Sequence, residues 1–323
     1  MGNIYLEKTI DVYKQAAGKP DVGLCCTTTP IWQLPDLNIP KIMKEMNYGC
    51  GSTVNPRDLV NNPNILYVGV GGGMELLQFS YFNRNKGAVI GVDVVDEMLT
   101  ASSTNLVEAE AINPWFSSNF IELRKGDALN LPIENESIDV AAQNCLFNIF
   151  KHDDLIKALH EMYRVLKPNG RLVLSDPICE QVIPDQLRND NRLRALCLSG
   201  SISLKEYIEI LTNVGFGTIE VRALRPYRIL SPNHYNTKEL IFIESVEVCA
   251  IKDPVPTDGP CVFTGKTAIY YGKEAFFDDN NGHTLLQNQP VTVCDKTAIA
   301  LNRLSNDIYI SESTFFYDGG GCC

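Results

Sequence analysis

The stretch ILYVGVGGGMELL, residues 65–77, decides the fold. Its first part is a short Ile/Leu/Val run of the kind that forms a buried strand, and its last part begins a helical pattern. Four glycines lie between the two parts, and those at positions 69, 71 and 73 have the alternating spacing of a GxGxG turn. Glycine lets the backbone turn tightly and lets a ligand approach it closely. The order strand, glycine turn, helix therefore predicts that Gly69, Gly71 and Gly73 form a ligand-binding turn.

An acidic residue follows at the distance that a nucleoside site requires. Asp93 ends the next apolar run, AVIGVD (88–93), and stands 22 residues after Gly71. A carboxylate at the end of this strand accepts hydrogen bonds from ribose hydroxyls, so we expect an adenine nucleoside as ligand. The dinucleotide fingerprint needs a third glycine where this chain has Met74. The nucleoside is therefore expected to differ from a nicotinamide or flavin dinucleotide.

Further apolar runs alternate with helical patterns along the chain. Such alternation implies a parallel sheet with helices on both faces. Ser203, with Glu206 three residues later, has the capping-box arrangement of a helix start, and a Pro/Asp-rich break at 253–260 is typical of a linker. We expect three parts: an N-terminal segment (1–60), a central domain (61–252) and a small α+β domain (253–323). The other expected strands are 120–127, 138–145, 170–176, 218–227 and 240–252, and the expected helices are 96–112, 153–167 and 203–216.

Composition excludes several classes of protein. The 323 residues carry a net charge of −11, which repels phosphate backbones and argues against nucleic-acid binding. No run of about 18 apolar residues exists, so no membrane span is expected. The N-terminus lacks a signal sequence, and we expect a cytoplasmic protein.

Eleven cysteines without an export signal do not form a disulfide framework. Reduced thiols that bind a soft ligand explain them better, although any single cysteine is equally well explained as buried packing.

Four motifs in order resemble the class I S-adenosylmethionine-dependent methyltransferases. They are GVGGG, GVDVVDEML, KGDALNLPIENESIDVAAQNC and LHEMYRVLKPNGRLVLSD. The resemblance implies a Rossmann-like, doubly wound α/β sheet and S-adenosylmethionine as cofactor. It places Met98 in the cofactor site, Asp127 at the adenine amino group, Ala128 at the ring edge and Asn144 at the methionine end. For each of these residues, a turn or core position is the simpler structural alternative.

Cysteine segments extend the resemblance to the arsenite S-adenosylmethionine methyltransferases over nearly the whole chain. NYGCGSTVNP is similar to the family's first arsenic-binding segment and gives Cys50, and RALCLSGSISLKEYIEIL is similar to its second and gives Cys197. DVGLCCTTT resembles an N-terminal segment that captures substrate through Cys25 or Cys26. As(III) is soft, so thiolates are its natural ligands. The likeness becomes loose after about residue 230.

The third arsenic thiolate is left open by the sequence. The family places it on the last strand of the sheet, where Cys249 comes about three residues late, and an odd shift along a strand changes the face on which a side chain lies. Cys179, after the fifth strand, is the alternative because ligands collect at that rim. We interpret Cys145 as a packing residue. The terminal pair Cys322 and Cys323 is expected to be a frayed tail or a second thiol site. Cys261 and Cys294 have no assigned role.

The resemblance implies arsenite methylation, as in detoxification, with glutathione or another small thiol as co-substrate and thioredoxin as a further candidate reductant. A monomer is expected. Arsenic brings its own lone pair and no proton, which agrees with four histidines of which none lies in a pocket motif. Two rivals remain. A methyltransferase of a small organic acceptor would need neither Cys50 nor Cys197, and a thiol-rich protein that sequesters As(III) or a soft metal would need no cofactor.

Overall fold

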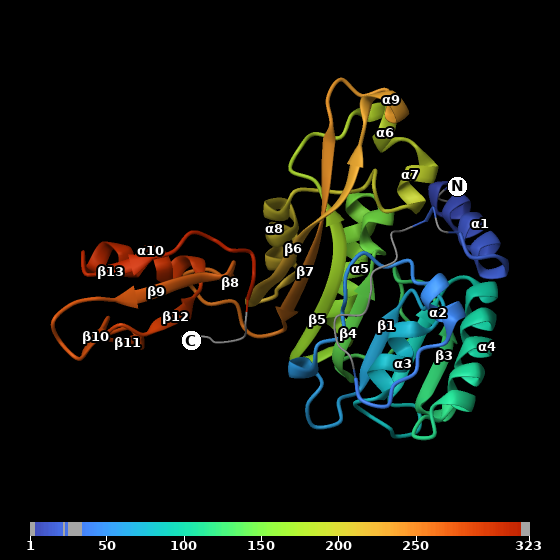
Figure 1. The fold of residues 1–323 in the computed structure, drawn as a ribbon, viewed down its shortest axis with the longest axis horizontal. Coiled ribbons are helices and arrows are strands. Elements are labelled where there is room, and N and C mark those ends of the chain that lie inside the picture. The colour runs from blue at the N-terminus through green and yellow to red at the C-terminus, as the bar shows by residue number, and fades with distance from the viewer. Residues whose placement is uncertain (1–3, 22, 25–33, 318–323) are drawn as a thin grey trace.

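The computed structural model describes residues 4–21, 23–24 and 34–317 (Figure 1). Its central feature is an eight-stranded sheet in the order β3-β2-β1-β4-β5-β7-β6-β8. The first five strands in this order are parallel, so their carboxyl ends meet at one edge. Their bounds are β1 Ile65–Val68, β2 Val89–Asp93, β3 Ile121–Lys125, β4 Ile138–Asn144 and β5 Leu166–Ile178.

The other side of the sheet contains antiparallel strands, whose direction the sequence had left open. Strand β6 (Thr218–Leu230) and strand β7 (Ile241–Ile251) pair antiparallel, and β7 also runs antiparallel to β5. No crossover helix of a dozen residues separates β6 from β7, and two strands joined directly must run in opposite directions. The short β8 (Cys261–Phe263) closes the sheet, parallel to β6. The doubly wound α/β sheet expected from the sequence is present, as a mixed sheet.

Two hydrophobic cores cover the two faces of the sheet. Alternate residues of β1 divide between them: Ile65 and Tyr67 belong to one core, and Leu66 and Val68 to the other. The first core also holds residues of α1, α2, α3 and α4, and the second holds residues of α5 and α8. These helices are α1 Ile4–Gly18, α2 Lys41–Glu45, α3 Met74–Ser80, α4 Asp96–Ile112, α5 His152–Val165 and α8 Leu204–Val214.

Short helical elements complete this part of the molecule. Helix α7 lies beside α1 at the edge where the parallel strands end (Figure 1). Ser203 caps α8 by accepting the backbone N–H of Glu206, which is one half of the expected capping box. The remaining short elements are η1 Pro56–Asp58, η2 Ser118–Phe120, η3 Phe147–Ile149, α6 Asp185–Arg188, α7 Asn191–Ala195 and α9 Pro232–Tyr235.

Residues after β8 build a small unit with a hydrophobic cluster of its own. It contains a three-stranded antiparallel sheet, a two-stranded sheet and one helix, seen on the left of Figure 1. The division of the chain at residue 253 stays a prediction. Among the described residues, no helix is both long and apolar enough to cross a bilayer. The elements of this unit are β9 Lys266–Tyr270, β10 Phe276–Asp278, β11 Thr284–Leu286, β12 Pro290–Val293, α10 Asp295–Leu304 and β13 Ile308–Ile310.

Candidate active site

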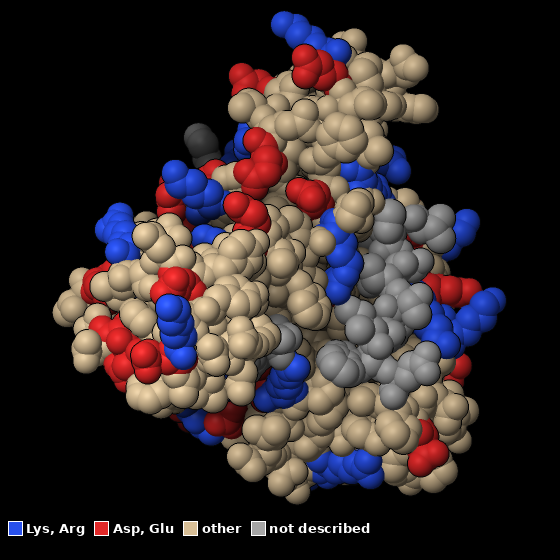
Figure 2. Space-filling view, turned by 60° about the vertical axis from the view of Figure 1, so that its left-hand side comes forward, with Lys and Arg blue, Asp and Glu red and all other residues tan. Residues whose placement is uncertain are grey.

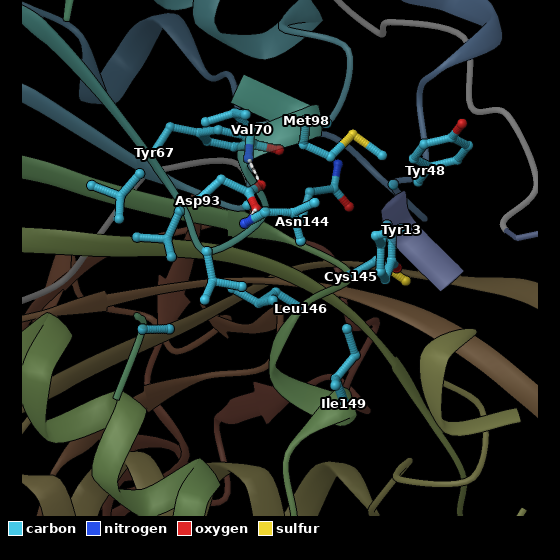
Figure 3. A pocket seen from close by; sticks show the side chains of 18 of the residues that line it. Tyr13, Tyr48, Tyr67, Val70, Asp93, Met98, Asn144, Cys145, Leu146 and Ile149 are labelled. Carbon is cyan, nitrogen blue, oxygen red and sulfur yellow. Dashed lines mark hydrogen bonds between the residues drawn. The ribbon is translucent and has the colours of Figure 1, made fainter. Parts of the chain in front are cut away.

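A cavity opens at the carboxyl ends of β1, β2 and β4 (Figure 3). This is the edge of a doubly wound sheet where ligands bind. One wall is the glycine turn after β1, and the opposite walls are the ends of β2 and β4 and the segment 46–49. Helix α1 covers it: Tyr13 lines the cavity and donates its hydroxyl proton to the Ala195 carbonyl of α7, 3.0 Å away.

The glycines of this turn have two different roles, although the sequence predicted that all three would form the ligand-binding turn. Gly69 (φ +84°) and Gly71 (φ +50°) have left-handed backbones and line the cavity. Gly73 (φ +85°) caps α3 and is absent from the lining. A Cβ on Gly73 would lie 2.7 Å from the Ser102 hydroxyl of α4, so this glycine permits close packing of α3 against α4.

Asp93 lies at the end of β2 and is held by two backbone donors. The N–H groups of Val70 and Val95 each donate to one of its carboxylate oxygens at 2.9 Å, and Figure 3 shows the first of these bonds. Burial raises the pKa of Asp93 to about 6, against the opposing effect of these donors. Three other expected residues, Met98, Asp127 and Ala128, also line the cavity.

Asn144 faces the cavity but directs its amide to the segment that carries Cys50. Its oxygen accepts the Cys50 N–H at 2.9 Å, and its nitrogen donates to the Gly51 carbonyl at 2.9 Å. A Cβ on Gly49 would lie 2.3 Å from the same nitrogen. Asn144 therefore positions the Cys50 segment, in addition to standing where the methionine end of a cofactor is expected.

Glu75 is a cavity residue that the sequence reading missed. It is a buried carboxylate at the start of α3, and it accepts hydrogen bonds from the Thr53 hydroxyl (2.6 Å), from Asn144 and from the Tyr67 hydroxyl. Burial raises its pKa despite these donors. The only sequence signal was an acidic residue two positions after the last glycine, which equally fits the negative charge favoured in any first helical turn.

Three cysteines lie along one chain of hydrogen bonds beside this cavity, and of the three only Cys145 lines it. The Cys197 thiol donates to the Cys145 carbonyl at 2.6 Å, and the Cys145 N–H donates to the Ser175 carbonyl at 2.7 Å. The Ser175 hydroxyl lies 3.4 Å from the Cys50 sulfur. Cys50 and Cys197 are 4% and 0% exposed, and Cys145 lines the cavity itself (Figure 3). Cys50 and Cys197, which are 147 positions apart in the sequence, are thus connected through two residues at the ends of β4 and β5.

Cys145, interpreted from the sequence as a packing residue, is 3% exposed within the hydrophobic core and also lines the cavity. Its backbone has a left-handed conformation, with φ at +61°, directly after β4 ends. This conformation is uncommon in a residue other than glycine or asparagine and marks a sharp change of direction. Figure 3 shows its sulfur on the same side of the cavity as Tyr13 and Ile149. Nothing in the motif QNCLFN distinguishes such a turn from a continued buried strand.

The two candidates for a third thiolate lie elsewhere. Cys249 is fully buried on β7, four residues or about 13 Å along the strand from Ser245, which donates to the Cys50 carbonyl. Burial raises the pKa of its thiol well above the usual range, although Arg222 acts in the opposite direction. Cys179 donates its thiol proton to the Gln181 carbonyl at 3.2 Å and its N–H to the Ile202 carbonyl, outside the hydrogen-bond chain that joins Cys50, Cys145 and Cys197. Cys25, Cys26, Cys322 and Cys323 lie outside the described residues.

Comparison with known proteins agrees with this geometry. A family model described as "Methyltransferase domain" matches residues 66–174. An arsenite methyltransferase of Homo sapiens is 29% identical over 93% of this chain and 80% of its own length, and one of Aquipseudomonas alcaligenes is 31% identical over 59% and 55%. The chain is therefore similar to arsenite methyltransferases over as much as 93% of its length. It spans only 43% of the length of the Halobacterium salinarum member, at 27% identity.

A solved structure supports the fold. An arsenic(III) S-adenosylmethionine methyltransferase from Chlamydomonas reinhardtii superposes with a TM-score of 0.58 and 21% identity, over 88% of this chain and 99% of that one. A methyltransferase domain of this fold takes S-adenosylmethionine as its cofactor. The cavity fits it: a nucleoside can approach the bare backbone at Gly69 and Gly71, Asp93 supplies acceptors for hydroxyls, and Glu75 offers a carboxylate to the ammonium group of the methionine end.

The pKa of Asp93 leads to a pH-dependent affinity for the cofactor. Ribose hydroxyls donate to the charged carboxylate and so favour it, which means that affinity should rise as pH increases through about 6 and fall below it by up to about tenfold per pH unit. Calorimetric titration with S-adenosylhomocysteine from pH 5 to pH 8 measures this. Asp93→Asn should bind weakly with no such slope, and an equal slope in both proteins would assign the titration to another group.

Proposed function

We propose that this chain methylates arsenite, with S-adenosylmethionine as methyl donor and thiolates of Cys50, Cys145 and Cys197 as ligands of As(III). The observation that carries the proposal is the chain of hydrogen bonds from Cys197 through the Cys145 backbone and Ser175 to Cys50, with Cys145 lining the cofactor cavity. As placed in the described residues, the side chains form no cluster of three ligands, so binding of arsenic would have to draw the three sulfurs together. Thiolate sulfur is the soft ligand that a soft, pyramidal As(III) centre prefers. The names of the relatives support the same substrate.

The roles of the three cysteines follow from exchange of thiols at arsenic. When As(III) arrives bound to a small thiol, each enzyme sulfur that bonds to arsenic breaks one As–S bond to that thiol. The proton of the enzyme thiol leaves with the departing small thiol, so the exchange needs no separate acceptor. The described cavity lining accordingly contains none of the histidines. Bound S-adenosylmethionine supplies a methyl group made electrophilic by the adjacent sulfonium.

Positioning is the main contribution that this chain makes. Asn144 holds the Cys50 segment by two hydrogen bonds, and the Cys145 carbonyl holds the Cys197 thiol. Helix α1 covers the cavity and, through Tyr13, contacts the segment that leads to Cys197. Orientation of this kind supplies roughly 7–11 kcal/mol of a barrier when the reacting atoms are well aligned. The Met46 and Met98 side chains give the cavity an apolar boundary.

The finer parts of the proposal concern partners. We take glutathione or a similar small thiol as the carrier of As(III) and as the reductant, with thioredoxin as an alternative reductant. A monomer in a reducing cytoplasm suits a site made of thiols. Capture of arsenite by Cys25 or Cys26 is part of the same proposal, because α1, which precedes them in the chain, lines the cavity.

Transfer of a labelled methyl group from S-adenosylmethionine to arsenite, with glutathione present, tests the function. The wild type should release methylated arsenic, and Cys197→Ser should release none while it still binds S-adenosylhomocysteine. Full activity of both proteins would remove Cys197 from the arsenic site. Label transferred only to an organic acceptor would favour a different methyltransferase, and arsenic binding without any transfer would favour sequestration.

A further inference from the structure

A second hollow lies on the other side of the segment that carries Cys50. Residue 49 of this segment lines the cofactor cavity and residue 52 lines the second hollow, which we call the arginine groove. The Ser52 N–H donates to Glu247 at 2.8 Å, and the groove wall includes Val173, two residues before Ser175 on β5. The groove is lined by Ser52, Val54, Asn55, Arg57, Val173, Arg222, Arg225, Glu247, Val248, Phe316 and Tyr317.

Cys50 lies between the cofactor cavity and the arginine groove, so a ligand in the groove would be close to this cysteine. The Cys50 sulfur contacts Ser175, whose strand forms one wall of the groove, and its carbonyl is held by Ser245 of β7. A ligand in the arginine groove would therefore lie next to the arsenic-binding segment without occupying the cofactor cavity. A co-substrate that reacts at arsenic while the cofactor is bound needs a site of this kind, next to the arsenic-binding segment and outside the cofactor cavity.

The charge of the groove contrasts with that of the chain. Three guanidinium groups and one carboxylate line it, in a protein whose net charge is −11. Elsewhere, on the face shown in Figure 2, acidic and basic residues are interspersed. Arg222 is committed to Asp58 and Glu220. Arg225 contacts Glu247 but remains 43% exposed, and the Arg57 guanidinium has no ion-pair partner among the described residues. The excess positive charge therefore belongs to Arg57, while Arg225 keeps part of its guanidinium exposed beside Glu247.

We propose that the arginine groove binds the carboxylates of a small acidic thiol, such as glutathione, that exchanges with arsenic at Cys50. This inference rests on the proposed function and adds the place where the thiol docks. Guanidinium groups bind carboxylates through paired hydrogen bonds. Val54 and Phe316 offer apolar contacts to the methylene groups of such a ligand. In the exchange, the As–S bond to the small thiol breaks, the bond from Cys50 to arsenic forms, and the departing thiol takes the Cys50 proton.

Kinetics with two thiols test the groove. The ratio of the KM for glutathione to the KM for uncharged 2-mercaptoethanol should rise about three- to fivefold in Arg57→Ala, since an exposed pair contributes about 1 kcal/mol or less. The charge reversal Arg57→Glu should raise this ratio further. Added salt should raise the wild-type ratio as well, because it screens the attraction. Arg303→Ala removes another exposed arginine, from α10, and should leave the ratio at its wild-type value.

A binding measurement separates the groove from the reaction. Calorimetry with S-methylglutathione, which cannot exchange at arsenic, should detect binding to the wild type and weaker binding to Arg57→Glu, with the diethyl ester binding to neither. If the wild type binds S-methylglutathione but does not methylate arsenite, the proposed function is overturned and the groove is a binding site for an acidic peptide. Methylation driven by glutathione with an unchanged KM ratio in both Arg57 variants would overturn the groove and leave the function intact.

Discussion

Cys145→Ser should lower the rate of arsenite methylation by about 100-fold or more while the affinity for S-adenosylhomocysteine stays the same. Serine is nearly isosteric with cysteine and keeps the backbone groups that bind Cys197 and Ser175. It replaces a soft ligand by a hard hydroxyl that binds As(III) poorly at neutral pH. The loss would therefore come from one missing arsenic bond and not from a displaced Cys197. Single-turnover methyl transfer with pre-bound arsenic measures it without interference from thiol recycling.

The matched controls are the two cysteines that the sequence had offered for this role. Cys179→Ser and Cys249→Ser change the same atom outside the cavity lining and should keep activity as long as thermal unfolding shows them folded. Binding of As(III) gives an independent readout. The arsenic–sulfur coordination number from X-ray absorption should fall by one in Cys145→Ser and stay constant in both controls. Loss of a sulfur ligand in Cys249→Ser instead would return the third thiolate to β7.

The fold could be predicted because its signals are local. Strand, glycine turn and helix follow one another in residues 65–77, and the expected helix 96–112 has the bounds of α4. The cavity wall was largely predicted for the same reason, since Gly69, Gly71 and Asp93 belong to two consecutive strand ends. Gly73 was misplaced because a glycine needed for helix packing looks the same in the sequence as one needed for a ligand.

The thiol cluster depended on contacts that no local pattern encodes. Cys145 meets Cys197 over a separation of 52 residues, and Cys50 meets Ser175 over 125. The resemblance gave Cys50 and Cys197 as predicted arsenic ligands, and the structure connects both, directly or through Ser175, to the backbone of Cys145. The antiparallel β7 was missed as a topological feature because β6 and β7 read as two further strands of unspecified direction. The sequence suggested which residues belong to the site, but it did not predict which of them contact one another across long separations in the chain.

Asp58→Asn should destabilise the protein by about 3–5 kcal/mol, because it leaves buried arginines without their counter-charge. The Asp58 side chain is 1% exposed and accepts hydrogen bonds at 2.9 Å from Arg171 of β5 and from Arg222 of β6. These bonds join residues 113 and 164 positions apart in the sequence. Since η1, with Asp58, ends the segment that begins at Cys50, the same change should also loosen the arsenic site. Urea unfolding measures the first effect and methyl transfer the second.

The pH dependence of this loss distinguishes a charge effect from a packing defect. Burial alone would raise the pKa of Asp58, but Arg222 and Arg171 hold it below its ordinary value. A carboxyl whose pKa is depressed in the folded state contributes stability above its unfolded pKa of about 4 and loses it as pH falls through the folded value. The difference between wild type and Asp58→Asn should therefore be full at pH 7 and shrink steadily below about pH 4. Glu209→Gln, which breaks an ion pair with side chains 61% and 85% exposed, should change stability by less than about 1 kcal/mol at pH 7. A difference for Asp58→Asn that stayed constant down to low pH would mean that the variant acts through altered packing of η1 and not through the buried charges.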